Sequence, residues 1–318
     1  MVKTSAPGKL MLFGDHSVVH NRPCIVTAVD HRISAIIEKN NSNKIIINAP
    51  DLEIKYETSI NDLEKEHPRK VVFAITAIKN FFKKYRINSG LNITTKSEFS
   101  SEFGLGSSSA VTVDVIKGLS ELFKIRISDK EMFDLSYKTV LEIQQVGSGF
   151  DVAAAIYGGS LFFVTGGKVI EKVDVQKLPL IVGYTGVKAD TSSLVKMVYR
   201  ELADEPERIN KNFNESERIV NEARLEIQKS NWKRVGELMD KNQQLLREIR
   251  VSSDELEKLI KAAKDAGAYG AKLSGAGGGD CMIAISDWKK YENIKKAIEN
   301  AGGKIIDVRL NAEGVITE

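Results

Sequence analysis

The segment that indicates the fold most directly is Gly104-Leu105-Gly106-Ser107-Ser108-Ser109-Ala110. It lies between a predicted strand at 91–95 and a predicted helix that ends near residue 123. Glycines let backbone N–H groups turn toward an anion without a Cβ in the way. The positive end of the following helix dipole points to the same place. The segment therefore predicts phosphate binding, with a flexible Gly/Ser connection as the alternative.

The same segment differs from two common nucleotide-binding motifs. No Lys-Ser/Thr pair ends a G-x-x-x-x-G stretch, so it is not a Walker A loop. Ser109 stands where the third glycine of G-x-G-x-x-G would be, which excludes the dinucleotide fingerprint as well.

A second glycine-rich segment lies near the end of the chain, Ser274-Gly275-Ala276-Gly277-Gly278-Gly279-Asp280-Cys281. So many glycines cost backbone entropy on folding. A packed protein tolerates that cost where the backbone must come close to another group. We interpret the segment as part of a site, with a tight connection before the apolar strand at 281–285 as the alternative.

Two charged residues occupy unusual places. Lys9 begins an apolar strand at 10–13, where a lysine that extends into solvent is the ordinary alternative. Asp151 begins an apolar helix, where it is either a helix cap or the acid/base group of a site. His16 and His20 are four residues apart, but the sequence around them is loop-like and no Cys/His cluster supports a zinc site.

Residue patterns predict a mixed α and β chain in two parts. Ile/Val-rich or alternating stretches predict strands at 10–13, 32–38, 44–48, 91–95, 160–164, 178–184, 281–285 and 304–310. Helical periodicity predicts helices at 68–85, 110–123, from Ser128 onward, and at 192–203, 215–229, 232–249, 253–266 and 288–300. We place a domain boundary between residues 165 and 180, which gives domains 1–170 and 171–318.

Composition excludes several classes of protein. The 318 residues are 42% hydrophobic and 28% charged, which is enough apolar residues for a sizeable core. A net charge of +3 is too small to indicate nucleic-acid binding. There is neither a signal-peptide pattern nor an apolar stretch of about 20 residues that could span a membrane. We expect a cytoplasmic protein, monomeric or homodimeric, with Cys24 and Cys281 as reduced thiols.

In their order and context, these segments resemble the GHMP kinases, named for galactokinase, homoserine kinase, mevalonate kinase and phosphomevalonate kinase. The resemblance extends from Pro7 to about Ile285. It implies an α+β fold with two domains. The N-terminal domain would resemble domain 2 of ribosomal protein S5, the C-terminal domain would be α/β, and the active site would lie in the cleft between them. ATP would be a substrate, and Mg²⁺ would accompany it.

The resemblance also implies roles for individual residues. Gly104–Ala110 would hold the ATP triphosphate, and Ser108 matches a serine that ligates Mg²⁺. Asp151 matches the catalytic aspartate, and Lys9 matches the lysine near it. Glu142 is the nearest counterpart of a metal-binding glutamate, although its spacing to Asp151 is shorter than usual. Where a proline usually precedes the phosphate loop, this chain has Ser100 or Ser101.

Within the family, the substrate-side residues resemble those of mevalonate kinases. His16 would lie near the mevalonate end of the cleft, and Thr191 matches a threonine on the substrate side. Gly275, Ala276 and Gly277 would line the cleft beside substrate and phosphates. The resemblance therefore implies phosphorylation of the 5-hydroxyl of mevalonate, a step of isoprenoid biosynthesis.

Two alternatives remain open. Gly147–Asp151 and Asp280 resemble phosphomevalonate kinases, so the acceptor could already carry a phosphate at its 5- or 3-position. Such an acceptor would need extra cations, for which Arg22, Lys188 and Lys196 are candidates. A non-catalytic nucleotide or metabolite sensor on the same fold is the other alternative. A sensor would have no need to retain Lys9, Ser108 and Asp151 together.

Overall fold

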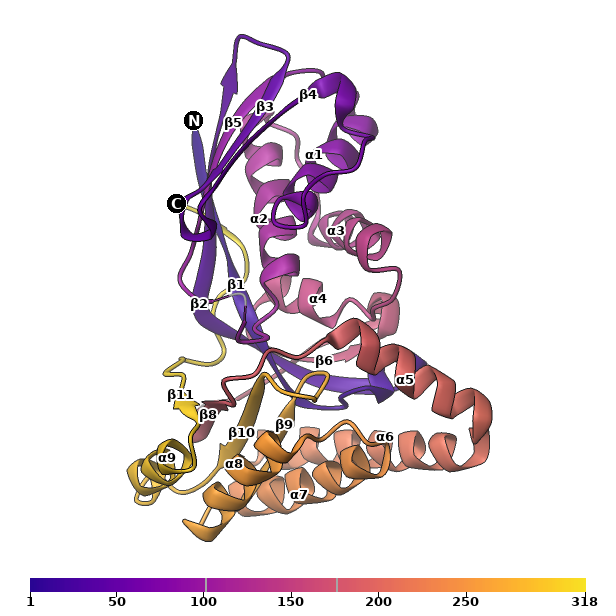
Figure 1. Cartoon of the computed structure of the whole chain (residues 1–318), viewed down its shortest axis with the longest axis vertical. Helices are drawn as coiled ribbons and strands as arrows, with labels where there is room; N and C mark the ends of the chain where they lie inside the picture. The colour runs from indigo at the N-terminus through magenta and orange to yellow at the C-terminus, as the bar shows by residue number, and fades with distance from the viewer. Residues whose placement is uncertain (101, 176) are drawn as a thin grey trace.

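A computed structural model describes residues 1–100, 102–175 and 177–318, so Ser101 lies outside the described residues. Two β-sheets organise the molecule (Figure 1). The larger sheet has eight strands, of which β12-β1-β2-β5-β3-β4 form one path and β6 and β7 extend from β2. The smaller sheet has four strands in the order β11-β8-β10-β9.

The larger sheet is built mainly from the first half of the chain. Its two longest strands are β1 (Val2–Phe13) and β2 (Pro23–Asn40), which pair antiparallel. The other strands from this half are β3 (Lys44–Ala49), β4 (Ile54–Ser59), β5 (Gly90–Ser97), β6 (Ser160–Val164) and β7 (Val169–Val173). β3 runs parallel to β5, and the helix between them makes the crossover that a parallel pair requires.

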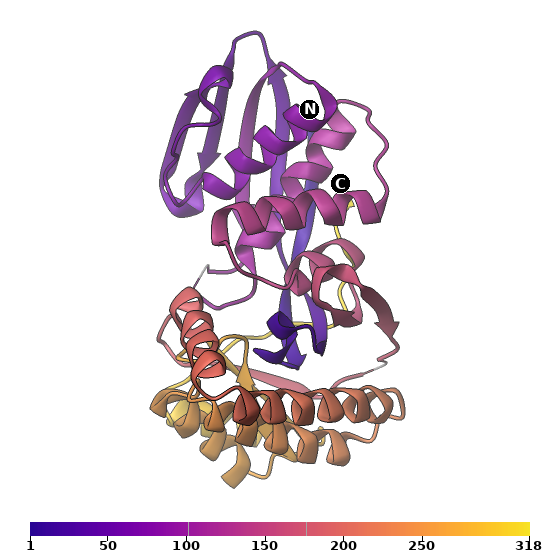
Figure 2. The same cartoon turned by 90° about the vertical axis from the view of Figure 1, so that its right-hand side faces the viewer.

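Four helices cover one face of the larger sheet (Figures 1 and 2). They are α1 (Val72–Tyr85), α2 (Ser107–Leu122), α3 (Asp129–Gln144) and α4 (Phe150–Tyr157). Ser128 caps α3 as predicted, because its side chain accepts a hydrogen bond from the Glu131 N–H. α2 and α4 each begin directly after a glycine-containing loop, so both helix N-termini face the same region.

The second half forms the smaller sheet and its helices. Its strands are β8 (Leu180–Tyr184), β9 (Gly270–Ser274), β10 (Cys281–Ile285) and β11 (Lys304–Ile305). Its helices are α5 (Thr191–Asp204), α6 (Pro206–Gln228), α7 (Trp232–Glu248), α8 (Asp254–Asp265) and α9 (Tyr291–Asn300). Figure 2 shows α6 and α7 lying side by side. α6 begins nine residues before the predicted 215, with Pro206 in its first turn.

Strand pairing continues across the predicted boundary between the two parts. The predicted boundary at 170/171 falls inside β7, which pairs with β6. The predicted last strand at 304–310 is also too long, since β11 ends at Ile305. Ile306 still donates to Val182 O, but the chain then leaves the smaller sheet, and β12 (Ile316–Thr317) pairs with β1. The last residues therefore belong to the first part.

A continuous apolar core crosses the interface between the two parts. The larger of two buried clusters contains Phe13 and Leu10 from β1 as well as Val182 and Ile283 from the smaller sheet. A second cluster lies under α8 and α9. Within the described residues, no helix is both long and apolar enough to cross a membrane.

Candidate active site

A large cleft of about 1450 Å³ lies between the two parts. Its wall contains the N-terminal turns of α2 and α4, the second half of β1, the loop before α5 and the second glycine-rich segment. Of the residues predicted for the site, those that line the cleft are Lys9, His16, Gly104, Gly106, Ser107, Ser108, Asp151, Thr191, Gly275 and Ala276. Segments more than 250 residues apart in the sequence thus meet in one cavity.

The first glycine-rich loop leads directly into α2. Gly104 and Gly106 both have positive φ, and Gly106 is the residue that precedes the helix. Lys9 is held against this loop by two hydrogen bonds, from its Nζ to Gly104 O at 2.8 Å and from its N–H to Leu105 O at 2.9 Å. An added Cβ on Gly106 would lie 3.1 Å from Lys9 Cγ, a tight contact, and the positive φ of Gly106 further favours glycine there.

Not every residue of the loop faces the cleft. Leu105, Ser109 and Ala110 are buried and do not line it. Ser107 and Ser108 do line it, at the helix N-terminus where free N–H groups and the dipole favour an anion. The arrangement suits a phosphate group that is bound by main-chain N–H groups and serine hydroxyls.

Asp151 lies in the first turn of α4, after Gly149 with its positive φ. Its Oδ2 accepts a hydrogen bond from Ser109 Oγ at 2.6 Å, and its Oδ1 accepts one from the Val152 N–H at 3.0 Å. The buried Ser109, which follows the first glycine-rich loop, therefore orients the carboxylate. Lys9 Nζ lies 5.3 Å from the ring centroid of Phe150, the residue before Asp151. The acid, the ammonium and the glycine loop thus share one end of the cleft.

His16 lies at another part of the cleft wall, in a backbone conformation with φ of 58°. Its Nε2 is 2.8 Å from Ala276 O, and a carbonyl can only accept, so Nε2 carries the hydrogen. Burial lowers the pKa of His16, which keeps the ring neutral. Nδ1 is then a buried acceptor without a partner among the described residues, and it is available to a hydroxyl group.

A buried ion pair supports this wall, and sequence reasoning missed it. Lys272 Nζ and Asp15 Oδ2 are 2.6 Å apart, and both side chains are 0% exposed. Asp15 Oδ1 also accepts from the Gly275 N–H at 2.7 Å, which fixes the second glycine-rich segment beside His16. Burial lowers the pKa of Lys272, while the Asp15 carboxylate opposes that shift. The available sequence signal for a buried charge was the position of this lysine, between Ala271 and Leu273 in an apolar strand.

Asp280 joins three segments at the end of the cleft that holds the first glycine-rich loop. Its Oδ1 accepts from the Ala189 N–H at 2.9 Å, and its N–H donates to Val187 O at 2.7 Å. Burial raises the pKa of the Asp280 carboxyl, opposed mainly by the hydrogen bond from Ala189. Its Oδ2 would lie 2.6 Å from a Cβ added to Gly104. Asp280 therefore holds the loop before α5 against both glycine-rich segments.

Several predicted site residues lie elsewhere. The Glu142 carboxylate pairs with Lys79 and accepts from Asn80 Nδ2 at 3.0 Å, and it does not line the cleft. Glu142 thus lies in the α1–α3 contact, away from the cleft, and its role as a metal ligand stays a prediction. Gly277 likewise packs against Val251, where a Cβ would lie 2.0 Å from the carbonyl oxygen, and it does not line the cleft either.

The cations proposed for a phosphorylated acceptor are also dispersed. Arg22 donates to Asn214 Oδ1 at 2.7 Å and lies 3.1 Å from Glu217, away from the cleft. Lys196 does not line the cleft, whereas Lys188 does.

Comparison with known proteins agrees with this geometry. Residues 72–159 match the GHMP kinases N terminal domain, and residues 223–304 match the GHMP kinases C terminal model. The chain is 34% identical to a mevalonate kinase of Thermococcus sibiricus, covering 100% of this chain and 98% of the relative. It is 29% identical to a mevalonate kinase of Saccharolobus solfataricus, covering 99% and 98%.

Solved structures of related kinases share the fold of this chain. The mevalonate kinase of Methanococcus jannaschii superposes with a TM-score of 0.84 and 27% identity, covering 97% of this chain and 98% of that one. A phosphomevalonate kinase of Streptococcus pneumoniae gives a TM-score of 0.85 at 19% identity, which shows the shared fold. The resemblance found in the sequence is confirmed, as is the two-domain mixed α and β fold. This chain belongs to the GHMP kinase family and is an ATP-dependent kinase.

Proposed function

We propose that this kinase transfers the γ-phosphoryl group of ATP to the 5-hydroxyl of mevalonate. The observation that carries the proposal is the convergence of Asp151, Lys9 and the glycine loop at one end of a single cleft. The full-length likeness to relatives named mevalonate kinase supports the choice of acceptor.

Phosphoryl transfer depends mainly on positioning and on stabilising negative charge. In our proposal the N-terminal turn of α2 and the loop before it bind the triphosphate through main-chain N–H groups. Asp151 orients the acceptor hydroxyl and takes its proton, while Ser109 holds the carboxylate in place. Lys9, fixed by Gly104 O, places a positive charge beside the transferred group.

The residues present fit a Mg²⁺ ion that arrives with the nucleotide. Mg²⁺ in kinases is held largely by phosphate oxygens and water, with one or two protein ligands. Ser108 offers a hydroxyl and Asp151 a carboxylate on the cleft wall, and neither requires a preformed cluster. Bound Mg²⁺ would neutralise charge on the phosphates.

The substrate side favours unphosphorylated mevalonate. His16 presents the unpartnered Nδ1 acceptor to a substrate hydroxyl, and Thr191 lines the cleft at the start of α5. The buried Lys272 that supports this wall is already paired with Asp15. Of the three cations considered for a second phosphate, Arg22 and Lys196 lie outside the cleft and Lys188 lines it, as do Arg69, Lys70 and Lys96.

An acceptor assay tests the proposal. ADP release would be followed with ATP, Mg²⁺ and one of mevalonate, mevalonate 5-phosphate or mevalonate 3-phosphate, with ATP alone as the control. We expect kcat/KM for mevalonate to exceed that for either phosphorylated compound by at least about tenfold, or about 1.4 kcal/mol. A preference for a phosphorylated acceptor would replace our proposal with the alternative one, and no ADP release with any of the three would support a sensor.

A further inference from the structure

The last residues of the chain run back along the first part of the molecule. We call residues 310–318 the C-terminal tail; it follows β11, and Figure 1 shows it rising in yellow toward the end of the chain. Leu310 bridges to Val29, and the Ala312 N–H donates to Ala28 O at 3.2 Å. β12 then pairs with β1. The tail is therefore fixed along the larger sheet by main-chain hydrogen bonds.

The tail meets the C-terminal end of α4. The Gly159 N–H donates to Ala312 O at 2.7 Å. A Cβ added to Gly314 would lie 2.0 Å from Ile156 O, and one added to Gly158 would lie 2.1 Å from the Gly314 nitrogen. No side-chain atom fits between the two backbones. The position of the tail thus limits where the end of α4 can be.

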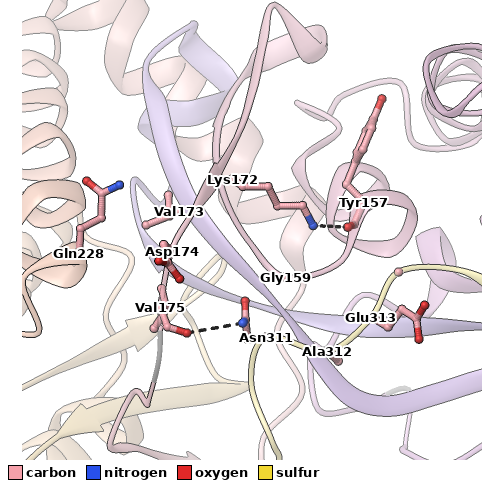
Figure 3. Close-up of a pocket in the computed structure, with 11 residues that line it drawn as sticks. Tyr157, Gly159, Lys172, Val173, Asp174, Val175, Gln228, Asn311, Ala312 and Glu313 are labelled. Atoms are coloured by element: carbon pink, nitrogen blue, oxygen red, sulfur yellow. Dashed lines mark hydrogen bonds between the residues drawn. The ribbon is translucent and has the colours of Figure 1, made fainter.

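Two cations hold this junction together. Arg32 donates from Nη1 to Glu313 O at 2.9 Å and from Nη2 to Gly314 O at 2.8 Å, and its Nε binds Ser5 Oγ on β1. On the other side, Lys172 donates to the Tyr157 and Gly158 carbonyls, which are free acceptors at the end of a helix. Figure 3 shows Lys172, Tyr157 and the tail residues 311–313 around a cavity of about 570 Å³.

α4 connects this junction to the active site. It has only eight residues, about 12 Å of helix, and Asp151 is the second of them. Val152, Ala153, Ala154, Ala155 and Ile156 are buried, so the helix is packed on the sides and held at both ends. Ser109 holds the Asp151 end, and Gly314 contacts the Ile156 end. A displacement at Ile156 should therefore move the Asp151 end as well, because a packed helix of only about two turns has little room to absorb it.

We infer that the C-terminal tail is a brace for catalysis: Gly314, seated by Arg32, sets the position of α4 and through it the position of the Asp151 carboxylate. Gly314 and Arg32 are positioning residues that do not touch the substrate. The inference rests on the proposed role of Asp151. A misplacement of about 1 Å at a reacting group can lower a rate by about 100-fold.

The test compares Gly314→Ala with Glu313→Ala, a matched control that changes the neighbouring side chain and keeps both carbonyls bound to Arg32. We expect Gly314→Ala to lower kcat by about 10- to 100-fold, while KM for ATP stays within about threefold of wild type. Arg32→Lys keeps the charge but loses the paired hydrogen bonds that the guanidinium group donates to two tail carbonyls. It should therefore also lower kcat, by a smaller factor than Gly314→Ala. Glu313→Ala should keep the wild-type kcat.

A double variant separates positioning from a general structural defect. In Asp151→Asn protein the residual turnover no longer depends on the carboxylate, so adding Gly314→Ala should lower it less than twofold. An equal loss in both backgrounds would overturn the inference, as would wild-type kcat in both Gly314→Ala and Arg32→Lys. These failures differ from that of the proposed function, in which Asp151→Asn itself would keep normal turnover.

Discussion

Replacing Lys272 with methionine should cause a large loss of stability, because it breaks a fully buried ion pair. Methionine has a similar length, so the variant removes the ammonium group with little change in volume. It leaves the Asp15 carboxylate fully buried, with the Gly275 N–H as its remaining hydrogen-bond donor. Removing one partner of a buried ion pair typically costs about 3–5 kcal/mol, because the other charge remains out of water.

The expected effect is large enough for thermal or chemical unfolding to measure. For a chain of this size, each kcal/mol shifts Tm by roughly 2 °C, so Lys272→Met should lower Tm by roughly 6–10 °C. Lys261→Met is the matched control. Lys261 pairs with Asp265 at 2.5 Å, but both side chains are mostly exposed, so Tm should not change measurably.

The double variant Lys272→Met/Asp15→Asn shows whether the loss comes from the unpaired charge. Asparagine keeps an oxygen for the Gly275 N–H and removes the charge, so the double variant should be more stable than the sum of the single losses by about 1–3 kcal/mol. A Lys272→Met protein that unfolds within about 1 kcal/mol of wild type, or single losses that simply add, would refute this reasoning.

Three further predictions follow from the site. Ser109→Ala removes the 2.6 Å hydrogen bond to Asp151, so kcat should fall by about 10- to 100-fold while KM for ATP stays nearly unchanged. A larger effect on KM than on kcat would contradict the role assigned to Ser109. Gly106→Ala introduces a Cβ at positive φ, 3.1 Å from Lys9 Cγ, and should destabilise the protein by about 1 kcal/mol. The same variant should bind ATP more weakly, as measured by calorimetry, and an unchanged ATP affinity would contradict this prediction. His20 packs between Tyr199 and Phe213, and burial, with nearby His16 and Arg22, lowers its pKa to about 4. The unfolded chain therefore binds the proton first, and stability should fall as pH drops from about 6.5 to about 4. His20→Phe should reduce the difference in Tm between pH 7 and pH 5, and an undiminished difference would refute the assignment.

The parts of the site that could be predicted from sequence were those with a local signal. The glycines at 104 and 106 precede a helix, and both have the positive φ that such a loop needs. Lys9 and Asp151 stood out as charges at the starts of apolar elements, and both line the cleft. Each of these features depends on a few neighbouring residues, so the local sequence pattern was sufficient to predict it.

The parts that could not be predicted depend on contacts between distant residues. Asp15 and Lys272 are 257 positions apart, and neither sequence neighbourhood specifies the partner. Arg32 binds carbonyls of the tail, which carry no side-chain signal at all. Glu142 was the nearest candidate for a metal-binding glutamate despite its short spacing to Asp151, and in the fold its carboxylate contacts Lys79 and Asn80 of α1.

The central claim is that the Asp151 carboxylate acts on the acceptor hydroxyl within a nucleotide cleft. Asp151→Asn tests it most directly, with turnover measured by ADP release in the presence of mevalonate and ATP affinity measured by calorimetry. The account predicts a loss of kcat of about 10²- to 10⁴-fold with the dissociation constant for ATP within a few-fold of wild type. Turnover within a few-fold of wild type in a variant that binds ATP normally would contradict it.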